Sequence, residues 1–509
     1  MLSVCRQSTL GCGNLLIATS SDVFGEPADG DTIPHEPAYL RKGAMTMSQA
    51  VHERPRPAAS SGLLSRLGLS RPELRAWAMY DWAVSAVQTT IMVAVFPVYF
   101  VNIARSDLPE SKATQAIATA NTIVAIVLAV LSPVLGAVSD YVAAKKRLLG
   151  ASMIVGASAV AGMFFVQQGD YRLALVLFIL SLIGATASTV FYDALLPHIA
   201  APDEIDRVSS AGYAVGYIGG GVLLALNLGW ILKPAWFGLP SGPNLSDSAA
   251  TLPTRLAFLS VAVWWVVFSI PLFRRVPEPP RTREADEVGR GNVLTAPFIR
   301  VGETFRALRG YKQGFLMLLA FMIYNDGIQT IQKMAATYGK ELGIADTVLI
   351  ASILIVQFVG FPFAFLFGMI ADRIGAKRTI FIGLLVYAGI SILGFYMRTA
   401  WHFMLLAAMV ATVQGGTQAL SRSLFASLVP THKSGEFFGF YSVFEKFASI
   451  FGPLLFWVTI ATTGSSRNAI LSVILFFAIG ALVLSRVKVA EGQQAARESD
   501  SGLITSAPL

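Results

Sequence analysis

Two short stretches of the chain share one pattern, GAVSDYVAAKKR at residues 136–147 and GMIADRIGAKRT at residues 368–379. Glycine, aspartate, alanine and lysine recur in both stretches at a constant offset of 232 residues. Each stretch lies between two long apolar runs, as a polar loop between two membrane segments does. A repeat of this kind predicts two halves that cross the membrane in the same orientation, with a solute path between them.

The remainder of the chain is strongly apolar for its length. Hydrophobic residues make up 54% and charged residues 14% of the 509 residues, and the mean hydropathy is +0.61. Soluble domains carry about 25% charged residues. The apolar runs are about 20 residues long, which suits helices that cross roughly 30 Å of hydrocarbon. We therefore expect an all-α membrane protein with about 12 transmembrane helices in two parallel six-helix halves.

Composition along the chain predicts five parts. They are a disordered N-terminal tail (1–74), a six-helix half (75–275), a cytoplasmic linker with an amphipathic helix (276–311), a second six-helix half (312–488) and a disordered C-terminal tail (489–509). A short connector without a membrane role is the alternative to the amphipathic helix.

The distribution of positive charge predicts the orientation of the chain. An even number of spans places both tails on one side, and the loops on that side carry more Lys and Arg than the opposite loops. Positive loops stay in the cytoplasm. We expect a multi-pass protein of the plasma membrane, the inner membrane in a bacterium, with both termini cytoplasmic.

Several function classes find no support in the sequence. The two cysteines, Cys5 and Cys12, lie in the N-terminal tail, and the five histidines form no cluster with them. No Gly-rich phosphate loop and no Gly-x-Ser-x-Gly turn is present. We expect no enzyme, no metal and no cofactor. The net charge of +8 lies in loops between spans, so no nucleic-acid partner is expected; the expected partners of a monomer are the lipid bilayer and a small solute.

The repeated loop resembles the signature loop of the major facilitator superfamily. Its first copy departs from the family pattern at Tyr141 and Ala143. Five longer stretches resemble the "unknown major facilitator" family, which includes autophagy-related vacuolar effluxers: MYDWAVSAVQTTI (from 79), FYDALLPHIA (from 191), IYNDGIQTI (from 323), GGTQALSRSLFASLVP (from 415) and GEFFGFYSVFEKFASIFGPLLF (from 435). Val84 replaces the Asn that is usual in the first of these.

The resemblance implies a secondary active transporter that works by alternating access. For the fungal vacuolar members it implies efflux of amino acids. Uptake of another small solute, a membrane sensor without transport and a lipid-handling protein of the same fold remain alternatives. The two signature loops are expected to gate the solute path through Gly136, Asp140, Lys145, Gly368, Asp372, Lys377 and Arg378.

Polar residues inside the spans are the candidates for substrate binding and coupling, because they are costly in hydrocarbon. Asp326 lies about 13 residues into a span, roughly 20 Å deep, and Asn325 and Gln329 form a polar stripe beside it. Desolvation favours the neutral form of a carboxyl group, so Asp326 is expected to couple transport to protons, assisted by Glu445. The alternative is that Asp326 caps or hydrogen-bonds a neighbouring helix.

Other candidates carry weaker signals. Tyr80 and Asp81 are expected at the cytoplasmic mouth, although Asp81 can instead favour its own helix N-terminus. Gln414 and Gln418 share one helix face and can equally join two helices. Lys446 either binds a substrate carboxylate or reaches the interface. Asn121 and Arg422 rank below these residues, and Asp193 is assigned a structural role.

Overall fold

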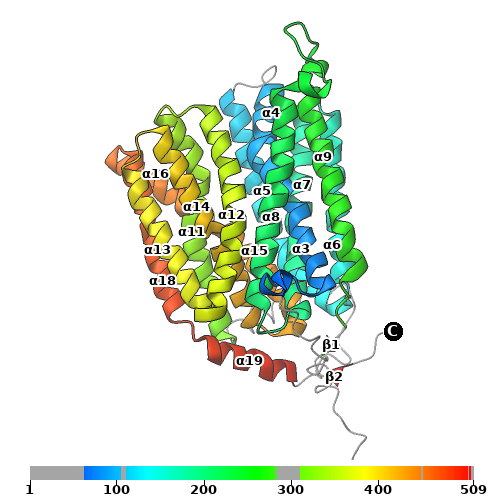
Figure 1. Cartoon of the computed structure of the whole chain (residues 1–509), viewed down its shortest axis with the longest axis vertical. Helices are drawn as coiled ribbons and strands as arrows, with labels where there is room; N and C mark the ends of the chain where they lie inside the picture. Colours follow the sequence, from blue (N-terminus) through cyan, green and yellow to red (C-terminus); the bar gives the residue numbers. More distant parts are fainter. Residues whose placement is uncertain are drawn as a thin grey trace, which may run out of the picture. The chain divides into compact units, whose positions relative to one another are not determined.

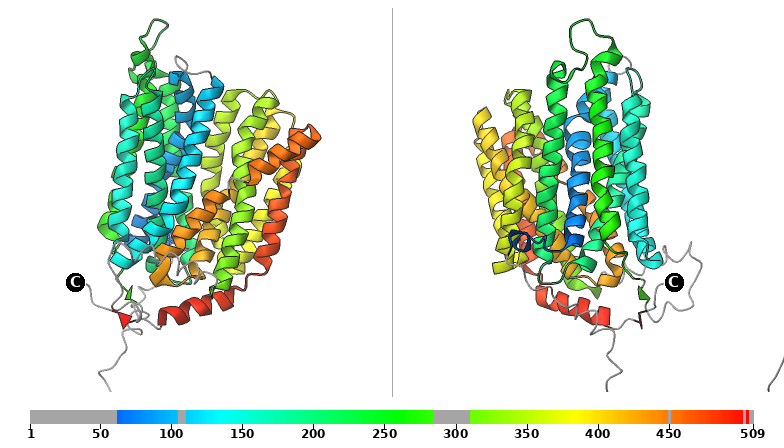
Figure 2. Two further views of the ribbon diagram at one scale, coloured as in Figure 1. Left: turned by 180° about the vertical axis from the view of Figure 1, so that it is seen from behind. Right: turned by 45° about the vertical axis from the view of Figure 1, so that its right-hand side comes forward.

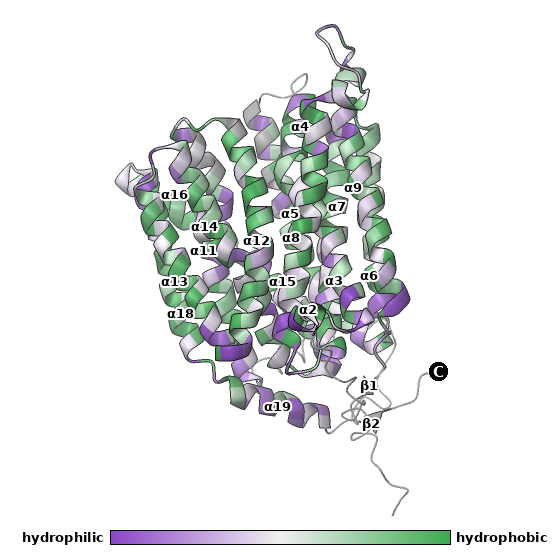
Figure 3. Cartoon of the chain, viewed as in Figure 1, coloured by the Kyte–Doolittle hydropathy of each residue, from purple (hydrophilic) through white to green (hydrophobic). Residues whose placement is uncertain are grey.

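A computed structural model of the chain describes residues 62–104, 110–280, 282–283, 310–448, 451–501 and 504–505. These residues form a bundle of long helices (Figure 1). Hydrophobic residues cover the length of the helices, and hydrophilic residues gather mainly at the two ends (Figure 3). Eleven described helices are long and apolar enough to cross a membrane, and a bent pair adds a twelfth when it counts as one span. The expected all-α membrane architecture is confirmed.

The first half contains the bent span and five further spans. Its elements are α2 (Leu63–Arg66), α3 (Pro72–Ala86), the π-helix η1 (Val87–Ala94), α4 (Phe96–Ala104), α5 (Glu110–Val142), α6 (Lys145–Gly162), η2 (Met163–Phe165), α7 (Tyr171–Ile199), α8 (Ile205–Leu232), η3 (Pro234–Phe237) and α9 (Asp247–Arg275).

The second half follows the linker. Its elements are α11 (Lys312–Glu341), α12 (Asp346–Ile374), α13 (Ala376–Phe395), α14 (Ala400–Ser427), η5 (Thr431–Lys433), α15 (Ser434–Phe447), α16 (Phe451–Thr463), α17 (Ser466–Ser472), α18 (Ile474–Ser485) and α19 (Val489–Ser501). Two short strands, β1 (Thr282–Arg283) and β2 (Ile504–Thr505), pair antiparallel, with Thr282 opposite Thr505.

The bend of 43° in the first span has a local cause. Pro97 has no N–H to donate, and a proline ring crowds the carbonyl one turn earlier. The hydrogen-bond ladder changes register just before it, since the N–H of Val95 donates to the carbonyl of Thr90 at 2.8 Å, five residues back. The chain therefore passes through a π-helical segment before α4 begins.

The two halves meet at one end of the bundle through closely packed backbones. We call this end the tail side, because α2 and α19 lie there (Figure 1, bottom). A Cβ atom at Gly136 of α5 would lie 2.1 Å from the carbonyl oxygen of Gly435 in α15. One at Gly439 would lie 2.6 Å from the carbonyl oxygen of Ser132. Small residues allow this approach where larger ones forbid it.

The N-terminal tail is ordered sooner than its composition predicts. Residues 62–74 contain α2 and the start of α3, so the prediction of disorder is wrong for this part, while residues 1–61 lie outside the described residues. Leu69 and Leu74 are buried, and Gly68 adopts a φ of +73° against the backbone of Arg207. Burial of these leucines stabilises the segment.

The C-terminal tail is helical through residue 501, so the prediction of disorder is wrong there too. Helix α19 lies across the tail side of the second half (Figure 2). Its sequence, VAEGQQAARESDS, is rich in helix-forming residues, and Gly492 and Ala496 form its buried face. The expected amphipathic helix of the linker lies outside the described residues.

The polar contacts of α19 hold the loop that precedes α15. The carboxylate of Asp500 accepts from the backbone N–H of Thr431 at 3.0 Å and lies 2.8 Å from Nδ1 of His432. Burial works to raise the pKa of Asp500, but the hydrogen bonds from His432 and Thr431 outweigh it, so this pKa lies below its ordinary value. The charged form is therefore the one that docks α19.

Replacing Gly136 by Ala should separate the halves on the tail side. The added Cβ meets backbone atoms of Gly435, and overpacking of this kind costs about 1–3 kcal/mol. Spin labels at Arg147→Cys and Arg486→Cys, both exposed positions, report the separation in a chain with Cys5 and Cys12 changed to Ser. We expect a longer mean distance. Gly389→Ala is the control, because among the described residues no atom beyond its own stretch of helix would lie within 4 Å of the added Cβ. Equal distances in both variants would contradict the packing argument.

Asp500→Asn should loosen α19. The lost charged acceptor, a third exposed, is worth about 1 kcal/mol, which corresponds to about fivefold faster amide exchange in α19. Because the pKa of Asp500 is lowered on folding, its contribution is present above the ordinary value of about 3.9 and is lost as the pH falls below it. If neither the substitution nor acid pH changed the amide exchange rates of α19, this docking contact would be refuted.

Candidate functional site

A buried arginine joins the two halves on the tail side. Arg422 of α14 is 2% exposed, although sequence reasoning ranked it low. Its Nη1 donates to Oδ1 of Asp193 at 2.9 Å, and its Nη2 lies 3.6 Å from Oδ2 of Asp81. Its Nε donates to Oγ of Ser209 at 3.0 Å, and Nη2 donates to the Ser209 carbonyl at 3.0 Å. One guanidinium thus binds three helices of the first half, α3, α7 and α8.

Aromatic rings enclose the same guanidinium. The carbon Cζ of Arg422 lies 4.9 Å from the ring centre of Trp77, 5.6 Å from that of Tyr192 and 4.6 Å from that of Tyr213. Cations within about 6 Å of an aromatic face are attracted by its quadrupole. We call the surrounding residues the cage; they are Trp77, Asp81, Tyr192, Asp193, Ser209 and Tyr213.

The cage is organised within the first half. Trp77 and Tyr192 stack with ring centres 4.4 Å apart, and the indole N–H of Trp77 donates to the Tyr192 carbonyl at 3.1 Å. The Tyr192 hydroxyl donates to Oδ2 of Asp81 at 2.7 Å. Gly212 leaves room, since a Cβ there would lie 2.5 Å from Oδ2 of Asp81. Asp193 accepts a hydrogen bond from Arg422 of the opposite half, so its role is not only structural within its own helix.

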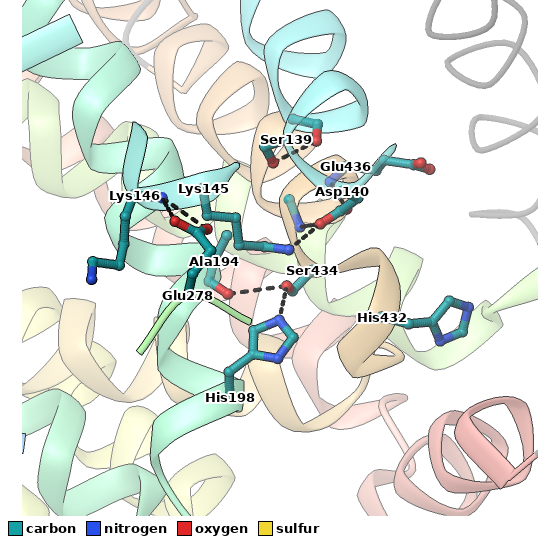
Figure 4. A network of polar contacts seen from close by, with 12 residues as sticks. Ser139, Asp140, Lys145, Lys146, Ala194, His198, Glu278, His432, Ser434 and Glu436 are labelled. Carbon is teal, nitrogen blue, oxygen red and sulfur yellow. Dashed lines mark hydrogen bonds and ion pairs between the residues drawn. The ribbon is translucent and has the colours of Figure 1, made fainter. Parts of the chain in front are cut away.

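Asp140, in the first signature loop, forms a second contact between the halves (Figure 4). It accepts from the backbone N–H groups of Gly435 and Glu436 at 3.2 and 2.9 Å, at the start of α15. Helix N-termini carry unsatisfied N–H groups and a partial positive charge, which suit a carboxylate. Lys145 pairs with the same carboxylate. Nearby, Nε2 of His198 lies 3.0 Å from the Ser434 hydroxyl.

Asp372, in the second signature loop, forms a weaker counterpart. Its carboxylate lies 3.1 Å from Nε of Arg207 in α8, and both side chains are about 30% exposed. The Asp140 and Lys145 side chains are at most 4% exposed. Both aspartates therefore reach the opposite half, but the first is buried and the second is solvated.

The two loops differ by one residue, which shifts the lysines. Ala143 and Gly375 both adopt positive φ, at the offset of 232 residues. Helix α6 then begins at Lys145, whereas α13 begins directly after Gly375. Lys146, with Nζ 3.1 Å from the Phe273 carbonyl at the end of α9, is the counterpart of Lys377.

Lys377 donates to the carbonyls of Ser485 and Val487 at the end of α18, at 2.9 and 2.7 Å. The predicted equivalence of Lys145 with Lys377 is wrong. The extra residue in the first loop frees Lys145 to pair with Asp140, while Arg378 of the second loop is exposed.

Asp326 lies against the start of a helix. Its Oδ1 accepts from the backbone N–H of Gly452 at 2.8 Å, in the first turn of α16. A Cβ at Gly452 would lie 1.7 Å from Oγ1 of Thr330, so this approach requires glycine. The contact matches the alternative of helix capping, and the role of Asp326 in coupling remains a prediction. Beside it, Asn325 is 1% exposed, and neither of its amide atoms has a hydrogen-bond partner among the described residues.

Five of the remaining candidates have half-buried side chains. They are Gln329, Gln414, Gln418, Glu445 and Lys446.

Tyr80 is fully buried beside Tyr192, at 5.0 Å between ring centres. Its ring packs in the aromatic core of the first half, and its expected place at the cytoplasmic mouth stays a prediction. Asn121 is exposed on α5, where its amide donates to the carbonyl of Ile117 at 3.1 Å.

One signal could have raised Arg422 in rank. Asp193 lies six residues before the end of α7 at Ile199, and Arg422 lies five residues before the end of α14 at Ser427. An arginine and an aspartate at equal depth in spans that end on the same side predict a pair. This equal depth is missed when the position of each residue in its own span is considered separately.

Two six-helix halves that meet through buried ion pairs beside one end of the bundle define a transporter of the major facilitator superfamily. The chain belongs to the family of vacuole effluxer Atg22-like proteins, whose model matches residues 69–497. The uncharacterized MFS-type transporter YxiO of Bacillus subtilis is 36% identical over 412 residues, 81% of this chain and 94% of that protein. Autophagy-related protein 22 of Coccidioides immitis is 24% identical, over 73% of this chain and 72% of its own length.

Solved structures share the fold. The proton:xylose symporter XylE superposes with a TM-score of 0.59 at 16% identity, over 83% of this chain and 95% of that one. A bacterial homologue of the iron transporter ferroportin, in its outward-facing state, superposes with a TM-score of 0.57 at 14% identity, over 82% and 99% of the two chains. Together with the family match and the MFS-type relative, the candidate spans assign the chain to the multi-pass membrane transporters, which are not enzymes.

Asp140→Asn should favour separation of the halves far more than Asp372→Asn. Hydrogen bonds to charged groups are worth about 1.5–3 kcal/mol, so the buried Asp140 should shift the equilibrium at least tenfold. The exposed pair of Asp372 is worth at most about 1 kcal/mol. The Arg147–Arg486 label pair measures both variants. Similar distance distributions for the two would show that burial of Asp140 does not strengthen the contact.

Proposed function

We propose that the chain exports a small amino-acid-like solute by secondary active, alternating-access transport, with the tail side in the cytoplasm. The observation that supports this most is the set of contacts between the halves on the tail side. Arg422, Asp140 and Asp372 all bridge the halves there. Helix α8 also contacts the second half from Ser210 to Gly221, in its tail-side and central parts. Such contacts act as a gate that opens when the halves rock apart.

The proposed solute is small and zwitterionic. The half-buried Gln329, Gln414 and Gln418 supply neutral hydrogen-bonding groups, and Glu445 and Lys446 supply one charge of each sign. The description of the family as vacuole effluxers supports export. A plasma-membrane location is proposed from the bacterial relative.

Proton coupling is proposed to act through Asp326, assisted by Glu445. Helix α15 ends at Phe447 and α16 begins at Phe451, and Asp326 accepts from the first turn of α16. A proton on Asp326 would remove its charge from this helix N-terminus and weaken the contact. The other end of α15 binds Asp140. Loading of Asp326 would therefore act on the candidate span Thr431–Thr463, whose other end binds Asp140 on the tail side.

Asp326→Asn should abolish gradient-driven accumulation and leave downhill exchange intact, because it keeps the shape of the side chain and removes the titration. Proteoliposomes with a pH gradient and radiolabelled leucine, with a mixture of the other amino acids as competitors, measure both activities. Asp247→Asn, an exposed acid in the first turn of α9, is the matched control.

Two outcomes would change this assignment. Uphill transport by Asp326→Asn with an unaltered pH profile would exclude Asp326 as the coupling site. Loss of exchange as well, in correctly inserted protein, would assign Asp326 to helix capping or substrate binding. Absence of flux for every amino acid, each supplied in turn as the radiolabelled solute to correctly inserted unaltered chain and Asp247→Asn, would reject the proposed solute class.

A further inference from the structure

The cage and its occupant belong to opposite halves of the protein. Every cage residue lies on α3, α7 or α8, whereas Arg422 lies on α14. The Trp77–Tyr192 stack and the Tyr192–Asp81 hydrogen bond hold the cage together without Arg422. If the halves part on the tail side, the guanidinium leaves and the cage remains.

An emptied cage has the chemistry of a site for an organic cation. Two carboxylates, Asp81 and Asp193, face one point from different helices. Three aromatic rings form walls around that point, and such walls attract ammonium groups and the CH groups beside them. The Ser209 carbonyl and hydroxyl add two acceptors.

When Arg422 leaves the cage, the carboxylates of Asp81 and Asp193 lose their positively charged partner. Removing one partner of a buried ion pair is strongly unfavourable, because the other charge is left uncompensated. Asp193 is 8% exposed. Opening of the tail side is thus unfavourable until water or another cation reaches the carboxylates.

We propose that the cage is the tail-side binding site for the protonated amine of the cargo, and that Arg422 occupies this site whenever the tail side is closed. The proposal rests on the transport function above and specifies its substrate class as solutes that carry an ammonium group. Cargo and Arg422 compete for one site, so cargo stabilises the open arrangement and closure expels it. Cargo and Arg422 therefore alternate in the cage, and the tail side cannot close while an amine is bound there.

The test uses propylammonium as the probe, in a chain with Cys5 and Cys12 changed to Ser and with Ser210→Cys added. Ser210 is 1% exposed at the contact of α8 with Gly368 of α12, so a maleimide reaches Cys at this position only when the halves part. Propylammonium chloride should raise the labelling rate at least threefold and saturate. Sodium chloride of equal ionic strength and propanol should not.

Variants locate the effect. Asp193→Asn should abolish the response to propylammonium, whereas Asp206→Asn should keep it, because Asp206 binds Ser423 outside the cage. In Arg422→Ala the cage is empty, so propylammonium should raise the Tm of this variant more than that of the unaltered chain. If Asp193→Asn fails to fold, the comparison of Tm shifts between Arg422→Ala and the unaltered chain tests the cage site instead.

Three results would overturn the proposal. They are an equal response to sodium, no response to the amine, and a response that persists in Asp193→Asn. Transport is not part of the assay, so the two proposals fail separately. Amine-dependent labelling without amino-acid flux would reject the proposed cargo and retain the cage site. Amino-acid flux without amine-dependent labelling would reject the cage site alone.

Discussion

The contacts between the two halves on the tail side depend on the permanent positive charge of Arg422. A guanidinium does not lose its proton in proteins, so a buried arginine must be matched by acceptors wherever it lies. Here the acceptors are Asp193, Asp81 and the backbone and hydroxyl of Ser209, each from the opposite half. Neither set of charges could be buried alone at this depth without a large desolvation cost. The closed arrangement thus depends on the two halves being present together.

Backbone packing and charge act on the same interface in different ways. The contacts of Gly136 and Gly439 with α15 and α5 permit close approach but give little preference for one state. Directional bonds supply that preference, most of it at Asp140, whose carboxylate meets the first N–H groups of α15. Asp372, which is solvated, contributes less. The two signature loops are related by sequence, yet the interface they form is asymmetric.

Much of the fold follows from the sequence, because the bilayer admits few solutions. Long apolar runs must be helices, and the repeated loop reveals two halves. The single extra residue after Ala143 was not predictable, since both loops end in basic residues and only backbone conformation distinguishes Lys145 from Lys146. The partners of Arg422 were hidden for another reason. They lie more than 200 residues away in the chain, and local patterns carry no information on such pairings. The order of α19 was missed because its polar composition resembles that of a tail, and only its docking stabilises it.

The position of α19 has a consequence for biosynthesis. The membrane spans are inserted in the order in which they are translated, and α19 follows all of them. Asp500 holds Thr431 and His432, which directly precede the turn of α15 that Asp140 binds. During insertion, the first turn of α15 is therefore present before α19 can bind the residues that precede it. The newly inserted protein is thus less firmly closed on the tail side than the finished one.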